Sequence, residues 1–149
     1  RLGWSAAGHA VLSGGLAGPA ALVDAHLRPR PPYSAGPAAA DLAATAMIDV
    51  SDGLVQDLGH VAAASGVAIA LEARALDVAA PLAEASRALG VDPVLWVLSG
   101  GEDHALAATF PPGRELPAEW RVVGRVTEGG GVSVDGEPWS GVAGWTHFA

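Results

Sequence analysis

One segment decides the fold expected of this chain: TAMIDVSDGLVQDLGHVAAASGVAIAL, residues 45–71. Residues 45–50 (TAMIDV) form a short apolar run that predicts a buried strand. Beyond the turn at residues 51–53, apolar side chains recur at the spacing of a helix with one buried face: Leu54, Val55, Leu58, Val61 and Ala62. Ser65-Gly66 is expected to end that helix, and residues 67–71 (VAIAL) predict the next strand.

The flanking sequence predicts further helices and strands on both sides of this segment. Helices are expected over residues 6–13, 19–25, 34–43, 81–89 and 93–98, with Ser5 capping the first of them. A strand is expected over residues 104–110, and a hairpin of residues 121–126 and 131–134 around Glu128-Gly129-Gly130. Strands interleaved with helices predict an α+β fold, a layered α/β domain with a mixed sheet and flanking helices.

The composition is that of one globular domain, residues 1–149, because half of the residues are apolar and only 16% are charged. The formal net charge of −8 argues against a nucleic-acid partner. Residues 2–23 carry no charged side chain, but Gly14, Gly15, Gly18 and Pro19 interrupt the run, so no membrane span is expected. Cysteine is absent, which excludes thiolate chemistry and agrees with a cytoplasmic location. Since the chain starts at Arg1, we expect it to be part of a longer protein.

The strongest chemical signal is the turn that contains Asp49, Ser51 and Asp52. Asp49 closes the predicted strand, and Ser51 and Asp52 open the predicted helix, where side chains converge at the edge of a sheet. Two carboxylates at this spacing suit Mg²⁺, which binds a few carboxylate oxygens together with phosphate oxygens. The Ser51 hydroxyl could reach a phosphate. The alternative is that Ser51 or Asp52 is only a helix cap and Asp49 a solvated strand end.

Two other motifs could contact a ligand. In GGED, residues 100–103, the glycines allow close backbone approach and Glu102 could accept hydrogen bonds from a polar ring. In GWTHF, residues 144–148, Trp145 could stack on a flat cationic ring. The alternatives are a tight turn with surface acids and a terminal aromatic pair folded onto the core. The histidines have no metal-ligand spacing, and no P-loop follows residues 129–131.

Five segments in a fixed order resemble the carboxyl-terminal half of thiamine-monophosphate kinases. They are GWSAAG (residues 3–8), HLRP (26–29), IDVSDGL (48–54), GGED (100–103) and GWTHF (144–148). The resemblance covers essentially the whole chain. It implies a fold like the carboxyl-terminal domain of aminoimidazole-ribonucleotide synthetase, which belongs to the same superfamily, and it implies that the amino-terminal ATP-binding domain is absent from this chain.

The resemblance also implies a reaction and the residues that serve it. The γ-phosphoryl group of ATP would pass directly to thiamine monophosphate, giving thiamine diphosphate, with several Mg²⁺ ions. By position, Asp49 and Asp52 would bind Mg²⁺, Ser51 would contact the ATP phosphates, and Glu102 and Trp145 would contact the substrate. No residue of this chain is assigned a catalytic role. The full-length enzyme would be a homodimer, and the isolated domain is expected to be inactive.

The chain departs from the family pattern after GGED. Family members usually carry Tyr-Glu-Leu there, whereas this chain has His104-Ala105-Leu106, so no role is assigned to His104 or Ala105. Two other functions remain open. One is another ATP-dependent synthetase of the superfamily, in the selenophosphate or purine pathway. The other is a non-catalytic binding domain that shares the fold.

Overall fold

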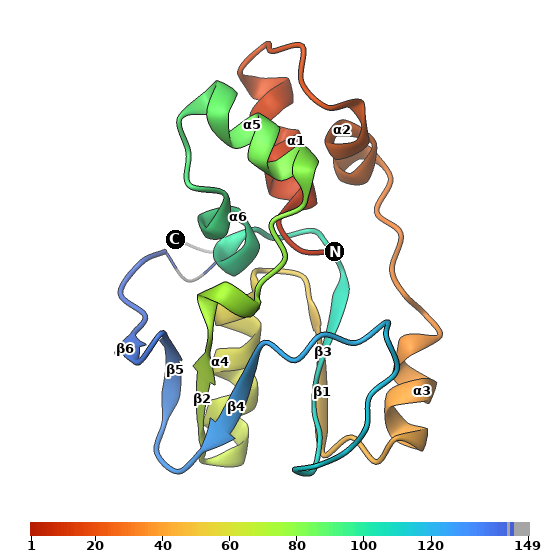
Figure 1. Ribbon diagram of the computed structural model, residues 1–149, viewed down its shortest axis with the longest axis vertical. Helices are drawn as coiled ribbons and strands as arrows, with labels where there is room; N and C mark the ends of the chain where they lie inside the picture. Colours follow the sequence, from red (N-terminus) through yellow and green to blue (C-terminus); the bar gives the residue numbers. More distant parts are fainter. Residues whose placement is uncertain (143, 145–149) are drawn as a thin grey trace.

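The computed structural model describes residues 1–142 and residue 144, and Figure 1 shows its elements in chain order. They are α1 (Trp4–Ser13), α2 (Ala20–Leu27), α3 (Ala35–Asp41), β1 (Ala46–Val50), α4 (Leu54–Ser65), β2 (Ala68–Leu71), η1 (Ala73–Ala75), α5 (Ala80–Leu89), α6 (Pro93–Ser99), β3 (Ala105–Thr109), β4 (Gly124–Thr127), β5 (Gly131–Val134) and β6 (Glu137–Pro138). All the helices and strands predicted from the sequence are present, with boundaries shifted by a few residues.

The deciding segment folds as its pattern predicts, into β1, α4 and β2. The apolar stripe of α4 is buried at Leu54, Val55, Leu58 and Ala62. The helix ends at Gly66, whose φ of 64° is a left-handed conformation that side chains with a Cβ rarely adopt. The chain then turns back into β2, whose Ile69 and Leu71 face the core.

The strands form two sheets. In the first, β1 pairs with β3 antiparallel, and Asp49 lies opposite Leu106. In the second, the order is β4-β2-β5-β6, with β2 antiparallel to β4 and parallel to β5. This mixed sheet with flanking helices confirms the predicted fold class. In Figure 1, α1, α2 and α5 lie at one end of the molecule and α4 lies with the strands at the other.

The predicted hairpin between β4 and β5 is wrong, because β2 lies between these two strands. The glycine-rich connection from Thr127 to Gly131 therefore spans two inter-strand spacings, about 9–10 Å. The reason is burial. Ile69 and Leu71 of β2 are almost fully buried, whereas β4 is exposed along most of its length, so β2 takes the central place.

The predicted capping role of Ser5 is also wrong. Helix α1 begins at Trp4, and its first residues have no side-chain cap from their own segment. Ser5 is buried, and its hydroxyl hydrogen-bonds with Nδ1 of His26 at 3.0 Å. The backbone N–H groups of Gly3 and Ser5 instead donate to the carboxylate of Asp103, about a hundred residues away.

One core joins the helical end to the sheets, with buried side chains from α1, α4, α5, α6 and β2. Its largest fully buried members are Leu22, Leu71, Leu82 and Leu98. The helices found among the described residues are all too short or too polar to span a bilayer.

Helix α6 offers a matched test of this core. Leu98 is 1% exposed and Leu95 is 47% exposed on the same helix. We expect Leu98→Ala to lower the free energy of unfolding by about 2–5 kcal/mol, because it leaves a cavity. Leu95→Ala should change it by no more than about 0.5 kcal/mol. Urea denaturation of both variants checks this, and equal losses would contradict the core described here.

Candidate functional site

The turn between β1 and α4 is held from inside the molecule by Asp57. This residue lies in the first turn of α4 and is only 3% exposed. Its Oδ2 atom accepts hydrogen bonds from the backbone N–H groups of Ser51, Asp52 and Gly53, at 3.0, 3.1 and 3.1 Å. Three donors on one buried carboxylate oxygen fix the backbone of the turn before any ligand arrives.

The predicted phosphate and metal residues lie on or beside this turn. Ser51 and Asp52 are partly buried, and Asp49 is at the end of β1 with its side chain 65% exposed. Within residues 1–142 and 144, no group of three or more metal-ligating side chains is placed to hold a metal ion. Carboxylate oxygens are the donors that Mg²⁺ prefers, so Asp49 and Asp52 fit this ion chemically but need further ligands.

The GGED segment lies directly against the turn, although fifty residues separate them in the chain. The backbone N–H of Glu102 donates to the carbonyl oxygen of Ser51 at 2.7 Å. A Cβ at Gly101 would lie 2.7 Å from that same oxygen, which is closer than real contacts allow. The second glycine of the motif therefore permits the approach that brings Glu102 to the turn.

His104 lies between the two exposed acids of the site. Its Nδ1 is 3.9 Å from Oδ2 of Asp49, and its Nε2 is 3.6 Å from Oε2 of Glu102. Asp49 and Glu102 therefore share one face of the molecule, with the imidazole ring bridging them. The sequence assigned no role to His104, and the structure places it at the centre of this face.

Asp103 turns the other way, into the protein, where it caps α1. Burial raises its pKa from the ordinary 3.8 to about 6. Hydrogen bonds from the backbone of Ser5 and Gly3 act in the opposite direction but do not offset the desolvation. The two acids of GGED thus have separate tasks: Glu102 faces solvent and Asp103 attaches the segment to α1.

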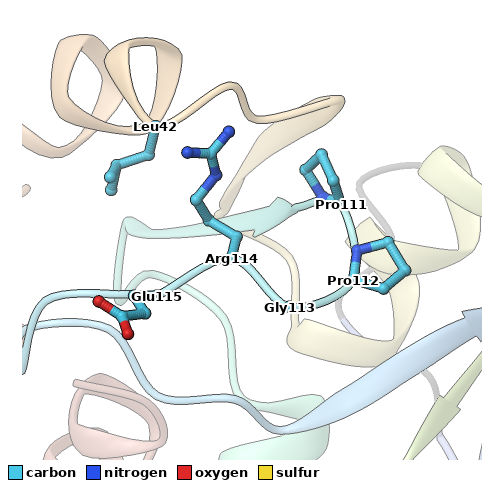
Figure 2. Close-up of a pocket in the computed structure, with 6 residues that line it drawn as sticks. All are labelled: Leu42, Pro111, Pro112, Gly113, Arg114 and Glu115. Atoms are coloured by element: carbon cyan, nitrogen blue, oxygen red, sulfur yellow. The ribbon is translucent and has the colours of Figure 1, made fainter.

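Among the hollows on the surface of residues 1–142 and 144, two lie near the elements described above. One, of about 560 Å³, is bordered by Asp49 and His104 and by the proline-rich segment before α3, including Pro29, Pro31 and Pro32. Figure 2 shows the other, of about 440 Å³, where Arg114 points from the loop after β3 toward Leu42. Only the first contains predicted site residues, so we assign the site to that side of the molecule.

The last predicted contact, Trp145, lies outside the described residues. Its neighbour Gly144 is described, and a Cβ there would lie 2.4 Å from the carbonyl oxygen of Asp52. The carboxyl-terminal segment therefore reaches the same turn at Gly144.

The role of Asp57 was not predicted from the sequence. The signal was present, because Asp57 falls on the apolar stripe of α4 beside Leu54, Leu58 and Val61. A charged residue on a buried helix face needs a polar partner inside the protein. The nearest possible partners of Asp57 were the backbone N–H groups at the start of its own helix.

The raised pKa of Asp103 predicts a pH dependence of stability. The unfolded chain releases this proton near pH 3.8 and the folded chain near pH 6. The folded state therefore binds more protons between these values, and the contribution of Asp103 falls as pH rises from 3.8 to about 6. In denaturant unfolding, the free energy of unfolding of the wild type minus that of Asp103→Asn should fall as pH rises over this interval and should be constant above it. A difference that rises instead would contradict the assignment.

Comparisons with known proteins agree on one family, although no family model matches the chain. Thiamine-monophosphate kinase of Mycobacterium tuberculosis is 55% identical over 150 residues, which cover 99% of this chain and 44% of that protein. The kinase of Corynebacterium glutamicum is 40% identical over 135 residues, 86% of this chain and 40% of the relative. The chain thus spans less than half the length of these relatives.

Solved structures give the same result. The structure of AaThiL complexed with AMPPCP and TMP is matched with a TM-score of 0.90 at 36% identity, covering 99% of this chain and 49% of that one. The crystal structure of thiamine monophosphate kinase from Aquifex aeolicus is matched with a TM-score of 0.85 at 35% identity, covering 93% and 48%. By sequence and by fold, therefore, the chain belongs to the thiamine-monophosphate kinase family.

Proposed function

We propose that this chain is the carboxyl-terminal domain of a kinase that transfers the γ-phosphoryl group of ATP to thiamine monophosphate, in thiamine diphosphate biosynthesis. One observation carries the proposal: the hydrogen bond from Glu102 to the Ser51 carbonyl, which joins the predicted phosphate segment to the predicted substrate segment. The relative complexed with AMPPCP, an ATP analogue, and TMP supports both ligands. Its relatives' names favour this reaction over the selenophosphate and purine synthetases.

Asp49 and Asp52 are the residues that would hold Mg²⁺, together with ligands outside this chain. The ion would offset the repulsion between anionic phosphates and the charge that develops during transfer. The Ser51 hydroxyl, on the same turn, would contact an ATP phosphate. Because Asp57 already fixes the backbone of this turn, these side chains need little reorganisation when the nucleotide binds.

Glu102 and Trp145 would bind the other substrate. The Glu102 carboxylate is 62% exposed and faces the His104 ring, and it would accept hydrogen bonds from the aminopyrimidine. The Trp145 ring would stack on the thiazolium cation, since an aromatic face attracts positive charge. Both residues would select for the two rings of thiamine, and neither would take part in proton transfer.

The remaining ATP contacts are assigned to an amino-terminal domain that this chain does not contain. We therefore propose that the working enzyme is longer than this chain, and the family resemblance implies a cytoplasmic homodimer. The carboxylates of Asp49 and Asp52 are required for turnover, and they do not by themselves supply a complete metal site.

Asn substitutions in the complete kinase test the metal role. Asp49→Asn and Asp52→Asn should each lower kcat by roughly 10²–10³-fold, because each removes charge that stabilises the transferring group. Asp77→Asn is the matched control, since the Asp77 side chain is 67% exposed, close to the 65% of Asp49. ATP-dependent formation of thiamine diphosphate is the measurement, and wild-type kcat in both site variants would refute the metal role of Asp49 and Asp52.

Residues 1–149 expressed alone should show no turnover of ATP with thiamine monophosphate and Mg²⁺, because the site lacks ligands from the rest of the enzyme. Adding the separately expressed amino-terminal part should restore product formation. Robust turnover by the 149-residue chain alone would contradict the division of the site between two domains.

A further inference from the structure

Three consecutive backbone N–H groups converge on one point at the start of α4. They belong to Ser51, Asp52 and Gly53, and all three point at Oδ2 of Asp57. Converging N–H groups at the start of a helix form a concavity that binds anions such as phosphate. In this protein the concavity is already filled by a carboxylate of the same helix.

The Asp57 carboxylate is a fixed part of the protein interior. Asp57 is 3% exposed, and among the ion pairs of the described residues none involves it. The three N–H dipoles and the amino-terminal end of α4 compensate for the burial of the Asp57 carboxylate. A phosphate could use these donors only by displacing a buried side chain that is part of the helix.

Resting on the proposed function, we infer that Asp57 is a positioning residue of the phosphate site, which occupies the N–H groups of the turn and leaves the side chains of Ser51 and Asp52 as its ligands. The turn has the backbone of an anion site, but its three N–H groups are already occupied by Asp57. It therefore meets a polyphosphate through a cation and the Ser51 hydroxyl, and not through its backbone.

The arrangement also fixes the distance between the two substrate segments. The Ser51 carbonyl accepts the N–H of Glu102 at 2.7 Å, while the Asp52 N–H of the same peptide group donates to Asp57 at 3.1 Å. Rotation of this peptide group would break both bonds. Asp57 therefore acts on the placement of Glu102 as well as on that of Asp52.

The test is Asp57→Asn in the complete kinase. The amide keeps the size of the side chain and one acceptor oxygen but removes the negative charge, so the three N–H groups that all bind Oδ2 are held by a weaker, neutral acceptor. We expect kcat to fall at least tenfold and the Mg²⁺ concentration for half-maximal activity to rise at least tenfold. The KM for thiamine monophosphate should rise at least threefold, because Glu102 is hydrogen-bonded to the same turn. The control is Asp92→Asn, because Asp92 also accepts a backbone N–H at a helix start, at 2.9 Å, outside the site. Unchanged kcat and Mg²⁺ dependence in a folded Asp57→Asn variant would overturn the inference.

Hydrogen exchange of the wild-type kinase tests the same point if the variant does not fold. The amides of residues 51–53 should exchange slowly in the free enzyme and should not slow further with ATP and Mg²⁺. Fast exchange that slows on ATP binding would mean that phosphate occupies these N–H groups, and would overturn the inference. A wild-type kinase without activity on thiamine monophosphate would refute the proposed function, while the exchange result would still decide the role of Asp57.

Discussion

The site depends on one buried carboxylate and the three backbone N–H groups that it accepts. Hydrogen bonds to a charged group are worth roughly 1.5–3 kcal/mol each, and the cost of leaving buried donors without an acceptor is similar. Asp57 therefore gives the turn between β1 and α4 a single conformation. With that conformation fixed, the Ser51 carbonyl is available to the N–H of Glu102, so two motifs fifty residues apart form one surface.

The acidic residues around this surface divide into two groups according to the direction they face. Asp57 and Asp103 turn inward and accept backbone N–H groups, and each attaches one segment to the start of a helix. Asp49 and Glu102 face solvent on either side of His104. The inward acids hold the backbone of their segments, and under the proposed function Asp49 would bind the cation and Glu102 the second substrate.

Much of the fold follows from local pattern, and most of the site does not. The strand, turn and helix of residues 45–65 were predicted because the apolar period changes from strand to helix at the Ser51-Asp52-Gly53 turn. The strand order β4-β2-β5 was not predicted, since the sequence pattern alone does not reveal which strand lies between two others. The cap of α1 was assigned to Ser5 and comes from Asp103, because that contact joins residues 98 positions apart. The motifs identified Asp49, Ser51, Asp52 and Glu102, but only the three-dimensional contacts show that Asp57 and His104 lie among them.

A crystal structure of the complete kinase with Mg²⁺, AMPPCP and thiamine monophosphate would test the role of this turn directly. We expect Mg²⁺–oxygen distances of about 2.0–2.1 Å to the carboxylates of Asp49 and Asp52. We also expect Asp57 still to accept the N–H groups of residues 51–53 when the nucleotide is bound. A phosphate oxygen on those N–H groups, or a metal ion that touches neither Asp49 nor Asp52, would contradict this arrangement.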